Sequence, residues 1–238
     1  AAAEGNSQHA FRVIMSEYEL FNSLKSGCQS DWAAYTKHRF VLELGAGTLP
    51  KESFRYYLQQ DYLFLIHFAR AYALAAFKAE DLEELRSAAA AVSAIVDTEM
   101  GLHVAFCERW GMGEAEMAAL PEDPANMAYT RYVLERGLSG DSLDLAAALA
   151  PCVVGYAEIG TWLSENATAQ GGDNPYQEWI DTYAADDYQE VAWAHAGQLD
   201  RLLQRRGGPG RIENLQRTFA EATRLEVGFW QMGIDAAG

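Results

Sequence analysis

Two segments of the chain, far apart in sequence, each combine a reactive group with an aromatic ring at helical spacing. Cys152 and Tyr156 are four residues apart, so on a helix they share a face. Glu226 shares a face with Phe229 in the same way. A thiol can act as a nucleophile, a carboxyl group can act as an acid/base, and aromatic rings can stack on a flat guest. Together they predict an aromatic-walled slot for a small planar molecule, with ordinary core packing as the alternative.

An acidic residue interrupts the apolar stripe of a long predicted helix. Asp61 shares its face with Phe64 and Phe68. A buried carboxyl group without a partner costs several kcal/mol, so Asp61 needs one. Two interpretations stay open: a structural partner such as a buried tyrosine or arginine, or a ligand amine or amidine that Asp61 binds.

Pro151 lies beside Cys152 inside a predicted helix. Its ring removes one backbone hydrogen bond and clashes with the carbonyl group four residues back, which costs about 3 kcal/mol in a helix interior. Three interpretations stay open. The helix tolerates a kink at Pro151, the helix begins after Pro151, or the kink turns the side chain of Cys152 toward a cavity. Cys152 itself is either a small buried hydrophobe or a nucleophile, and a nucleophile needs a stabilised thiolate or an adjacent base.

The histidines do not follow the spacing of a metal site. Di-metal helical bundles use Glu-x-x-His pairs, and the chain has none. Glu99 and His103 come nearest, with one residue too many between them. We therefore expect no metal and no cofactor, although a haem or di-metal helical protein stays the third alternative.

Composition narrows the class of protein. The formal charge of −16 on 238 residues argues against nucleic acid and anionic membranes as partners. Three cysteines without a CxxC pair favour a reducing compartment, so we expect a cytoplasmic protein. The apolar run 88–96 is well short of the roughly 20 residues of a membrane span. Met15 resembles a natural start, and we expect residues 1–14 to be a disordered or appended segment.

Helical periodicity recurs throughout, with short breaks and no convincing strand. We expect Thr48 to cap one helix, with Pro50 early in its first turn, and Asp141 to cap the helix that carries Cys152. The fold class is all-α, and residues 15–238 form one helical-bundle domain. The expected helices cover 17–36, 38–45, 51–78, 81–111, 124–138, 141–167, 175–184, 187–206 and 211–233.

Several motifs in order along the chain resemble the TenA family, also called thiaminase II or aminopyrimidine aminohydrolase. The resemblance runs from about Gly45 to Met232. It is carried by Gly47-Thr48-Leu49-Pro50, Tyr56-Tyr57-Leu58-Gln59-Gln60-Asp61, Leu149-Ala150-Pro151-Cys152, Tyr156-Ala157-Glu158-Ile159-Gly160, Pro175-Tyr176-Gln177-Glu178-Trp179-Ile180 with Thr182-Tyr183, and the segment from Glu226 to Trp230.

The resemblance implies a haem-oxygenase-like bundle that uses no haem and assembles as a homotetramer. It implies thiamin salvage by hydrolysis at the methylene carbon of a 4-amino-2-methylpyrimidine. The substrate would be 4-amino-5-aminomethyl-2-methylpyrimidine, which becomes the hydroxymethyl pyrimidine with release of ammonia. Thiamin itself is a second expected substrate.

The resemblance also implies a role for each matching residue. Cys152 is the expected nucleophile and Glu226 the acid/base, which belongs to the cysteine-bearing branch of the family. Asp61 is the expected anchor for the ring nitrogen and amino group. The remaining expected substrate contacts are Phe64, Tyr129, Tyr156, Tyr183 and Phe229.

Phe64 departs from the family pattern. Better-known members often have a tyrosine there, whose hydroxyl supports the catalytic thiol. The alternative function is therefore a pyrimidine-binding protein of the same fold with weak or no hydrolase activity.

Overall fold

The computed structural model describes residues 18–166 and 174–238, and the expected segment 1–14 with Met15 lies outside them. Within the described residues the chain is helical and contains no strand. The helices are α2 (Glu19–Ser26), α3 (Gln29–Thr36), α4 (Arg39–Ala46), α5 (Lys51–Lys78), α6 (Leu82–Ser93), the π-helix η1 (Ala94–Glu99), α7 (Met100–Arg109), α8 (Glu114–Ala118), α9 (Pro124–Ser139), α10 (Ser142–Asn166), α11 (Gln177–Ala184), α12 (Asp186–Arg206) and α13 (Arg211–Asp235).

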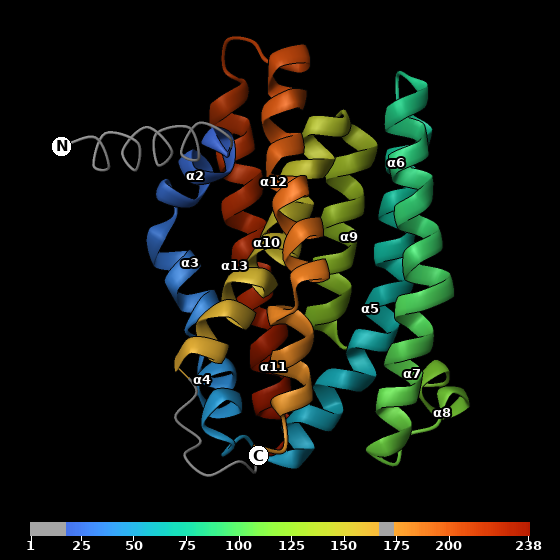
Figure 1. Cartoon of the computed structure of the whole chain (residues 1–238). Coiled ribbons are helices and arrows are strands. Elements are labelled where there is room, and N and C mark those ends of the chain that lie inside the picture. Colours follow the sequence, from blue (N-terminus) through green and yellow to red (C-terminus); the bar gives the residue numbers. More distant parts are fainter. Residues whose placement is uncertain (1–17, 167–173) are drawn as a thin grey trace, which may run out of the picture.

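Helix α10 forms the centre of the bundle (Figure 1), where it packs against α9, α11, α12 and α13. Helices α2, α3 and α4 run along one side of the bundle, and α6 with α7 forms a column along the other. That column joins the rest of the molecule chiefly through α5. Since α5 also contacts α9 and α13, it connects the column to the core.

The composition of α10 explains its central position. It is rich in alanine, leucine and valine, and nearly every residue between Leu143 and Leu163 is buried. Asp141 caps it as predicted, since its carboxylate accepts from the backbone N–H of Leu143 at 2.9 Å. Small alanine side chains allow neighbouring helices to approach from several directions, so α10 needs no polar face.

Pro151 lies inside α10, so the prediction that this helix begins later is wrong. Two tyrosines from other helices bind the backbone around it. Tyr35 donates to the carbonyl oxygen of Pro151, and Tyr188 donates to that of Val153, each at 3.2 Å. These bonds hold the backbone on both sides of Cys152, which fixes the position of its side chain.

Helix α5 has the predicted bounds, but its predicted cap is wrong. Pro50 occupies the N-cap position, and no side chain accepts there. Thr48 instead closes the C-terminal end of the preceding helix α4, because its backbone N–H donates to the carbonyl oxygen of Glu43 at 2.9 Å. Gly47, with φ of 70°, turns the chain at the end of α4 and brings Thr48 into that position.

Two predicted helices are interrupted. The range 17–36 is split at Gly27, where a Cβ atom would lie only 2.2 Å from the side chain of Gln216 in α13. The range 81–111 contains the π-helical segment η1 and ends at Arg109. Asp81 caps it as expected, accepting from the backbone N–H of Glu84 at 2.8 Å. The short helix α8 was not predicted.

Two helical stretches are long and apolar enough to cross a membrane by length and composition alone. One is α10, and the other is the continuous column Leu82–Arg109. The apolar window of α10 is 89% buried inside the protein, whereas that of the column is 11% buried. The sequence prediction from run 88–96 therefore underestimated both apolar stretches.

Candidate active site

Glu226 lies in the interior, one turn before Phe229 on α13, and both are buried. The hydroxyl of Tyr129 on α9 donates to Glu226 Oε1 at 2.7 Å. Burial raises the pKa of Glu226 to about 8, the Tyr129 and Cys152 interactions lower it, and the charge of Asp61 raises it. Glu226 is therefore protonated near neutral pH in the empty site and can change its state with modest changes in its surroundings.

Cys152 on α10 is buried, and among the charged groups around it Glu226 acts most strongly on its thiol. Burial raises the pKa of the Cys152 thiol well above its ordinary value, and the charges of Glu226 and Asp61 raise it further. The resting sulfur is consequently a thiol, and it needs a base at the moment of attack. Glu226 is the candidate for that base.

Asp61 on α5 is buried, and burial raises its pKa to about 6. Its nearest basic partner is His103 on α7, whose Nδ1 lies 3.5 Å from Asp61 Oδ2. The structural partner that the sequence suggested, a tyrosine or arginine, is thus a histidine. The other oxygen of Asp61 is free to face a ligand.

Two sets of aromatic rings surround the three reactive groups. In the first, Phe64 stacks on Tyr129 with centroids 5.6 Å apart and meets Phe229 edge-on at 5.6 Å. In the second, the ring centroid of Tyr156 lies 4.9 Å from that of Tyr183 and 5.3 Å from that of Trp230. All of the predicted site residues therefore converge, from α5, α9, α10, α11 and α13.

Three residues at the site were missed as site residues by sequence reasoning. Tyr57 contacts Tyr156 and accepts a hydrogen bond from Trp179 at 3.2 Å. Its place one helical turn before Asp61 was a usable signal. Tyr35 and His103 come from α3 and α7. The sequence drew attention to His103 only as a metal ligand spaced from Glu99, and nothing in the local sequence marks Tyr35.

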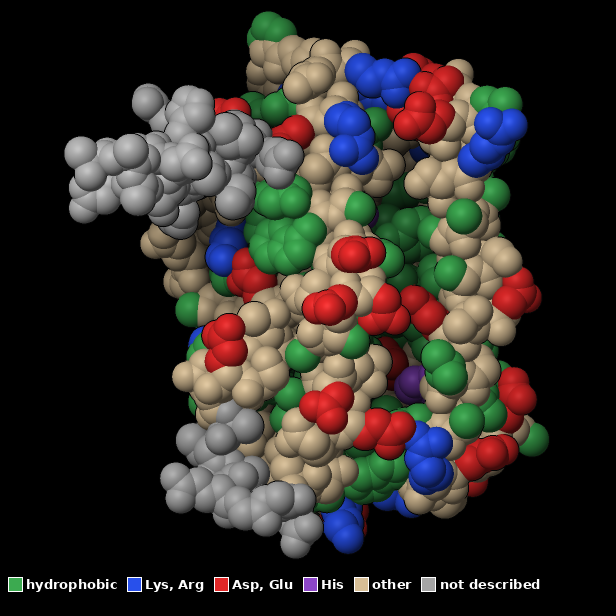
Figure 2. All heavy atoms as spheres, viewed as in Figure 1, with side chains coloured by type: hydrophobic (Ala, Val, Ile, Leu, Met, Phe, Trp, Pro, Cys, Tyr) green, Lys and Arg blue, Asp and Glu red, His purple; other side chains and the backbone are tan. Residues whose placement is uncertain are grey.

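The structure leaves little open space on one side of the site. The hollow that touches Phe64 and Tyr129 measures about 10 Å³, which is at the lower limit for one water molecule. Figure 2 shows a furrow between the central bundle and the α6–α7 column, with acidic side chains gathered along it.

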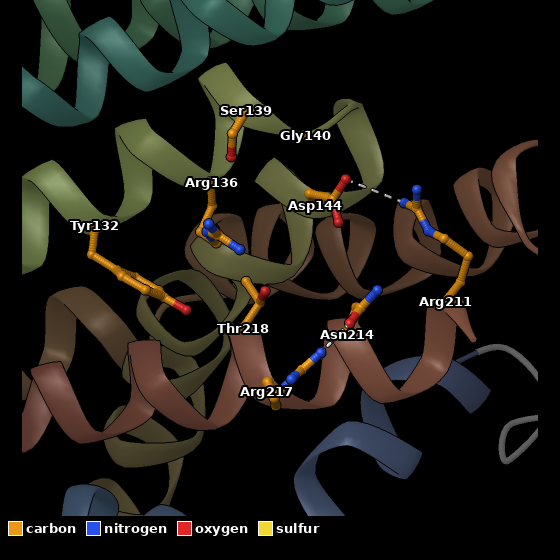
Figure 3. A pocket seen from close by; sticks show the side chains of 9 residues that line it. All are labelled: Tyr132, Arg136, Ser139, Gly140, Asp144, Arg211, Asn214, Arg217 and Thr218. Atoms are coloured by element: carbon orange, nitrogen blue, oxygen red, sulfur yellow. Dashed lines mark hydrogen bonds and ion pairs between the residues drawn. The ribbon is translucent and has the colours of Figure 1, made fainter.

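A larger hollow lies elsewhere, between α9, α10 and the start of α13 (Figure 3). It measures about 620 Å³, and three arginines are among the residues that line it. Arg211 already pairs with Asp141 and Asp144, and Arg136 with Glu135. None of the predicted site residues lines this hollow, so it is not the candidate active site.

No group of three His, Cys, Asp or Glu side chains in residues 18–166 and 174–238 is arranged to hold a metal ion.

Comparison with known proteins identifies the family of the chain. Residues 27–236 match the TENA/THI-4/PQQC family. The chain belongs to this family. An "Uncharacterized protein" of Haemophilus influenzae is 39% identical over 218 residues, covering 92% of this chain and 100% of that protein. An aminopyrimidine aminohydrolase of Halalkalibacterium halodurans is 36% identical over 214 residues, covering 90% and 94%.

Solved structures confirm the TenA-like, haem-oxygenase-like fold. A TenA family transcription regulator from Silicibacter is 50% identical, with a TM-score of 0.86 and coverage of 90% of this chain and 96% of that one. A domain of unknown function with a heme oxygenase-like fold, from Shewanella denitrificans, has a TM-score of 0.67 at 13% identity, with coverage of 90% and 92%.

Proposed function

We propose that this TenA family protein hydrolyses 4-amino-5-aminomethyl-2-methylpyrimidine to the hydroxymethyl pyrimidine and ammonia. The observation that carries the proposal is the buried Glu226 bonded by Tyr129, with the Cys152 thiol close enough for the charges of Glu226 and Asp61 to raise its pKa. Aromatic walls lie on two sides of this cluster. A planar ring between the walls would meet a nucleophile, an acid/base and an anionic anchor together.

In the proposed complex, Asp61 binds the edge of the ring that carries the amino group and the neighbouring ring nitrogen. That edge is an amidine, and once protonated it offers two parallel N–H groups to one carboxylate. The protonated ring can accept an electron pair, so the carbon beside the aminomethyl-bearing position becomes open to attack.

Glu226 manages the protons. The aminomethyl group enters as an ammonium ion, and its positive charge lowers the pKa of Glu226. Glu226 therefore releases its proton to water as the substrate binds, and it takes up a proton from water again when the product leaves. The carboxylate takes the thiol proton of Cys152 as the sulfur adds to the ring and the ring cation is neutralised. The ring electrons then expel ammonia from the methylene group, the cation returns, and the ammonia takes the proton from Glu226.

Water completes the cycle. The ionised Glu226 removes a proton from water as oxygen adds to the exocyclic methylene carbon. The ring electrons then expel the sulfur of Cys152, which takes the proton back from Glu226. The net reaction consumes one water and releases one ammonium ion, and both catalytic groups return to their starting states.

The replacement of a tyrosine by Phe64 does not leave the thiol unsupported. Tyr129 lies against Phe64, its hydroxyl donates to Glu226, and it is close enough to Cys152 for the sulfur to raise its pKa. This favours the hydrolase over the alternative of a binding protein without activity.

Regulation of transcription, which the description of the Silicibacter relative suggests, is disfavoured by charge. DNA phosphates would be repelled by a chain with a formal charge of −16.

Thiamin cleavage and assembly into a homotetramer belong to the same proposal. The leaving group of thiamin is a thiazole, which is bulkier than ammonia and needs more room in the site. Sedimentation of the purified protein measures the assembly, and a mass of one chain would contradict it.

The deciding experiment measures ammonia release from the aminomethyl pyrimidine and, separately, binding of the hydroxymethyl product by calorimetry. We expect turnover by the wild type, and a loss of about 100-fold or more in Glu226→Gln. Tight product binding without ammonia release by the wild type would support the binding protein instead. Thiamin as a second substrate in the same assay separates the two expected reactions.

A further inference from the structure

His103 is fixed between two acceptors. Its Nε2 lies 2.9 Å from the carbonyl oxygen of Leu58, and its Nδ1 lies 3.5 Å from Asp61 Oδ2. The side chains of His103 and Asp61 are each only 11% exposed. Because they come from different helices, α7 and α5, the packing of the column against α5 sets their distance.

The carbonyl oxygen decides how the ring is protonated. A carbonyl group only accepts, so Nε2 carries a hydrogen. Nδ1 then faces the Asp61 carboxyl group, and one proton must lie between them because a lone pair would oppose an anionic oxygen. If that proton is on Asp61, the anchor has lost one acceptor. If it is on His103, both oxygens of Asp61 stay acceptors.

We propose that His103 is a positioning residue that holds this proton on Nδ1 and so keeps Asp61 ionised to receive the two N–H groups of a protonated amidine edge. The inference rests on the proposed function and concerns only how Asp61 is kept ionised. Rings without an amino group beside a ring nitrogen would lose the second hydrogen bond.

The chemistry of the reaction requires this ionised anchor at each step. The ring is a cation before sulfur adds and again after ammonia leaves, and in both states its partner is Asp61. A carboxylate stabilises that cation with two charge-assisted bonds, whereas a neutral carboxyl group offers one acceptor. His103 contacts neither the ring nor the reacting carbon, so it acts only through Asp61.

Other titratable groups also face Asp61, and all of them stay in place when His103 is changed. They are Tyr57 on α5, Glu99 on η1, Cys107 on α7, Cys152 and Tyr156 on α10, Tyr183 on α11 and Glu226 on α13. None of these groups can become cationic, so among the described residues His103 is the basic side chain that faces the anchor.

The test compares His103→Gln with wild type. A glutamine amide can still donate to the Leu58 carbonyl oxygen, but it has no basic nitrogen for Asp61. We expect the acid limb of the kcat/KM profile to move to higher pH, because Asp61 without its cation takes up a proton more readily. At pH 6 we expect a loss of about 10-fold, mainly in KM, which shrinks toward pH 8.

Leu102→Gln, an exposed change on the same helix, is the matched control and should keep the wild-type profile. A His103→Gln profile that runs parallel to wild type, or equals it, would overturn the inference. Calorimetric binding of the hydroxymethyl product at pH 6 and pH 8 gives a second measurement that needs no turnover. This measurement separates the two proposals. The hydrolase proposal fails if the wild type releases no ammonia, whereas the inference about His103 fails if product binding by His103→Gln has the same pH dependence as product binding by the wild type. His103→Asn, checked for folding by circular dichroism, should shift the acid limb in the same direction.

Discussion

Helix α10 and the column Leu82–Arg109 are both long and apolar, yet they occupy opposite environments. The apolar window of α10 is 89% buried and that of the column 11%. Helix α10 is surrounded by four other long or medium helices, whereas the column packs chiefly on α5. Apolar composition alone therefore does not determine whether a helix is buried, because burial depends on how many other helices pack around it.

The two regions also contribute differently to the site. Helix α10 supplies Cys152 and Tyr156 from a backbone held on both sides by tyrosines. The column supplies His103, which reaches the site only through Asp61. We therefore expect changes in α10 to affect stability and catalysis together, and changes on the column surface to affect neither strongly.

The largest expected difference between the two regions is in the free energy of unfolding after a leucine in each is replaced by alanine. Leu143 in α10 is fully buried, and Leu102 in the column is 66% exposed. Leu143→Ala should lower the free energy of unfolding by about 2–5 kcal/mol because it leaves a cavity. Leu102→Ala should change it by less than about 0.5 kcal/mol. Urea denaturation measures both, and equal losses would refute the contrast drawn here.

Alanine substitutions at two glycines, one in each region, should change the stability of the protein in opposite directions. A Cβ atom at Gly155 in α10 would lie 2.3 Å from the ring of Tyr35, whereas one at Gly101 in α7 would meet nothing within 4 Å. Gly155→Ala should therefore destabilise the protein by about 1–3 kcal/mol. Gly101→Ala should stabilise it by about 0.5–1 kcal/mol through helix propensity. Thermal unfolding of the two variants checks the signs, and a stabilising Gly155→Ala would contradict the packing around Cys152.

The third expected effect is a pH dependence of stability. The pKa of Glu226 is about 8 in the folded chain against an ordinary 4.5. The folded state thus binds this proton more tightly, so its stabilising contribution is complete below pH 4.5 and is lost as pH rises toward 8. Glu226→Gln removes that loss and should gain stability relative to wild type between pH 5 and pH 8. Glu221→Gln, nearer the surface on the same helix, should follow wild type, and parallel curves for all three proteins would argue against a buried, protonated Glu226.

Local signals predicted much of the fold. Asp81, Asp141 and Pro50 mark helix starts in the sequence, and the helices that follow begin within one residue of the predicted position. The break at Gly27 was not predictable in the same way. It depends on the side chain of Gln216, which α13 brings against Gly27 from the other end of the chain.

In the candidate site too, some residues could be predicted from the local sequence and others depend on the packing of distant segments. Cys152, Glu226 and Asp61 stand out because reactive groups occupy apolar helical faces, and the family motifs assign the tyrosines. The partnership of His103 with Asp61 arises from the packing of α7 on α5, which no local pattern records. The small size of the hollow beside Phe64 is also a property of packing, since it depends on how closely side chains from different helices meet.

The most direct test of the central claim, that Cys152 and Glu226 act as one unit, is a double-mutant cycle in kcat/KM for ammonia release. Cys152→Ala and Glu226→Gln should each lower kcat/KM by about 10²–10⁴-fold, and the double variant should be no slower than the slower single variant. Cys28→Ala, at another buried cysteine, is the control and should keep the wild-type rate. Losses that multiply in the double variant, or a single variant that works at the wild-type rate, would contradict the account.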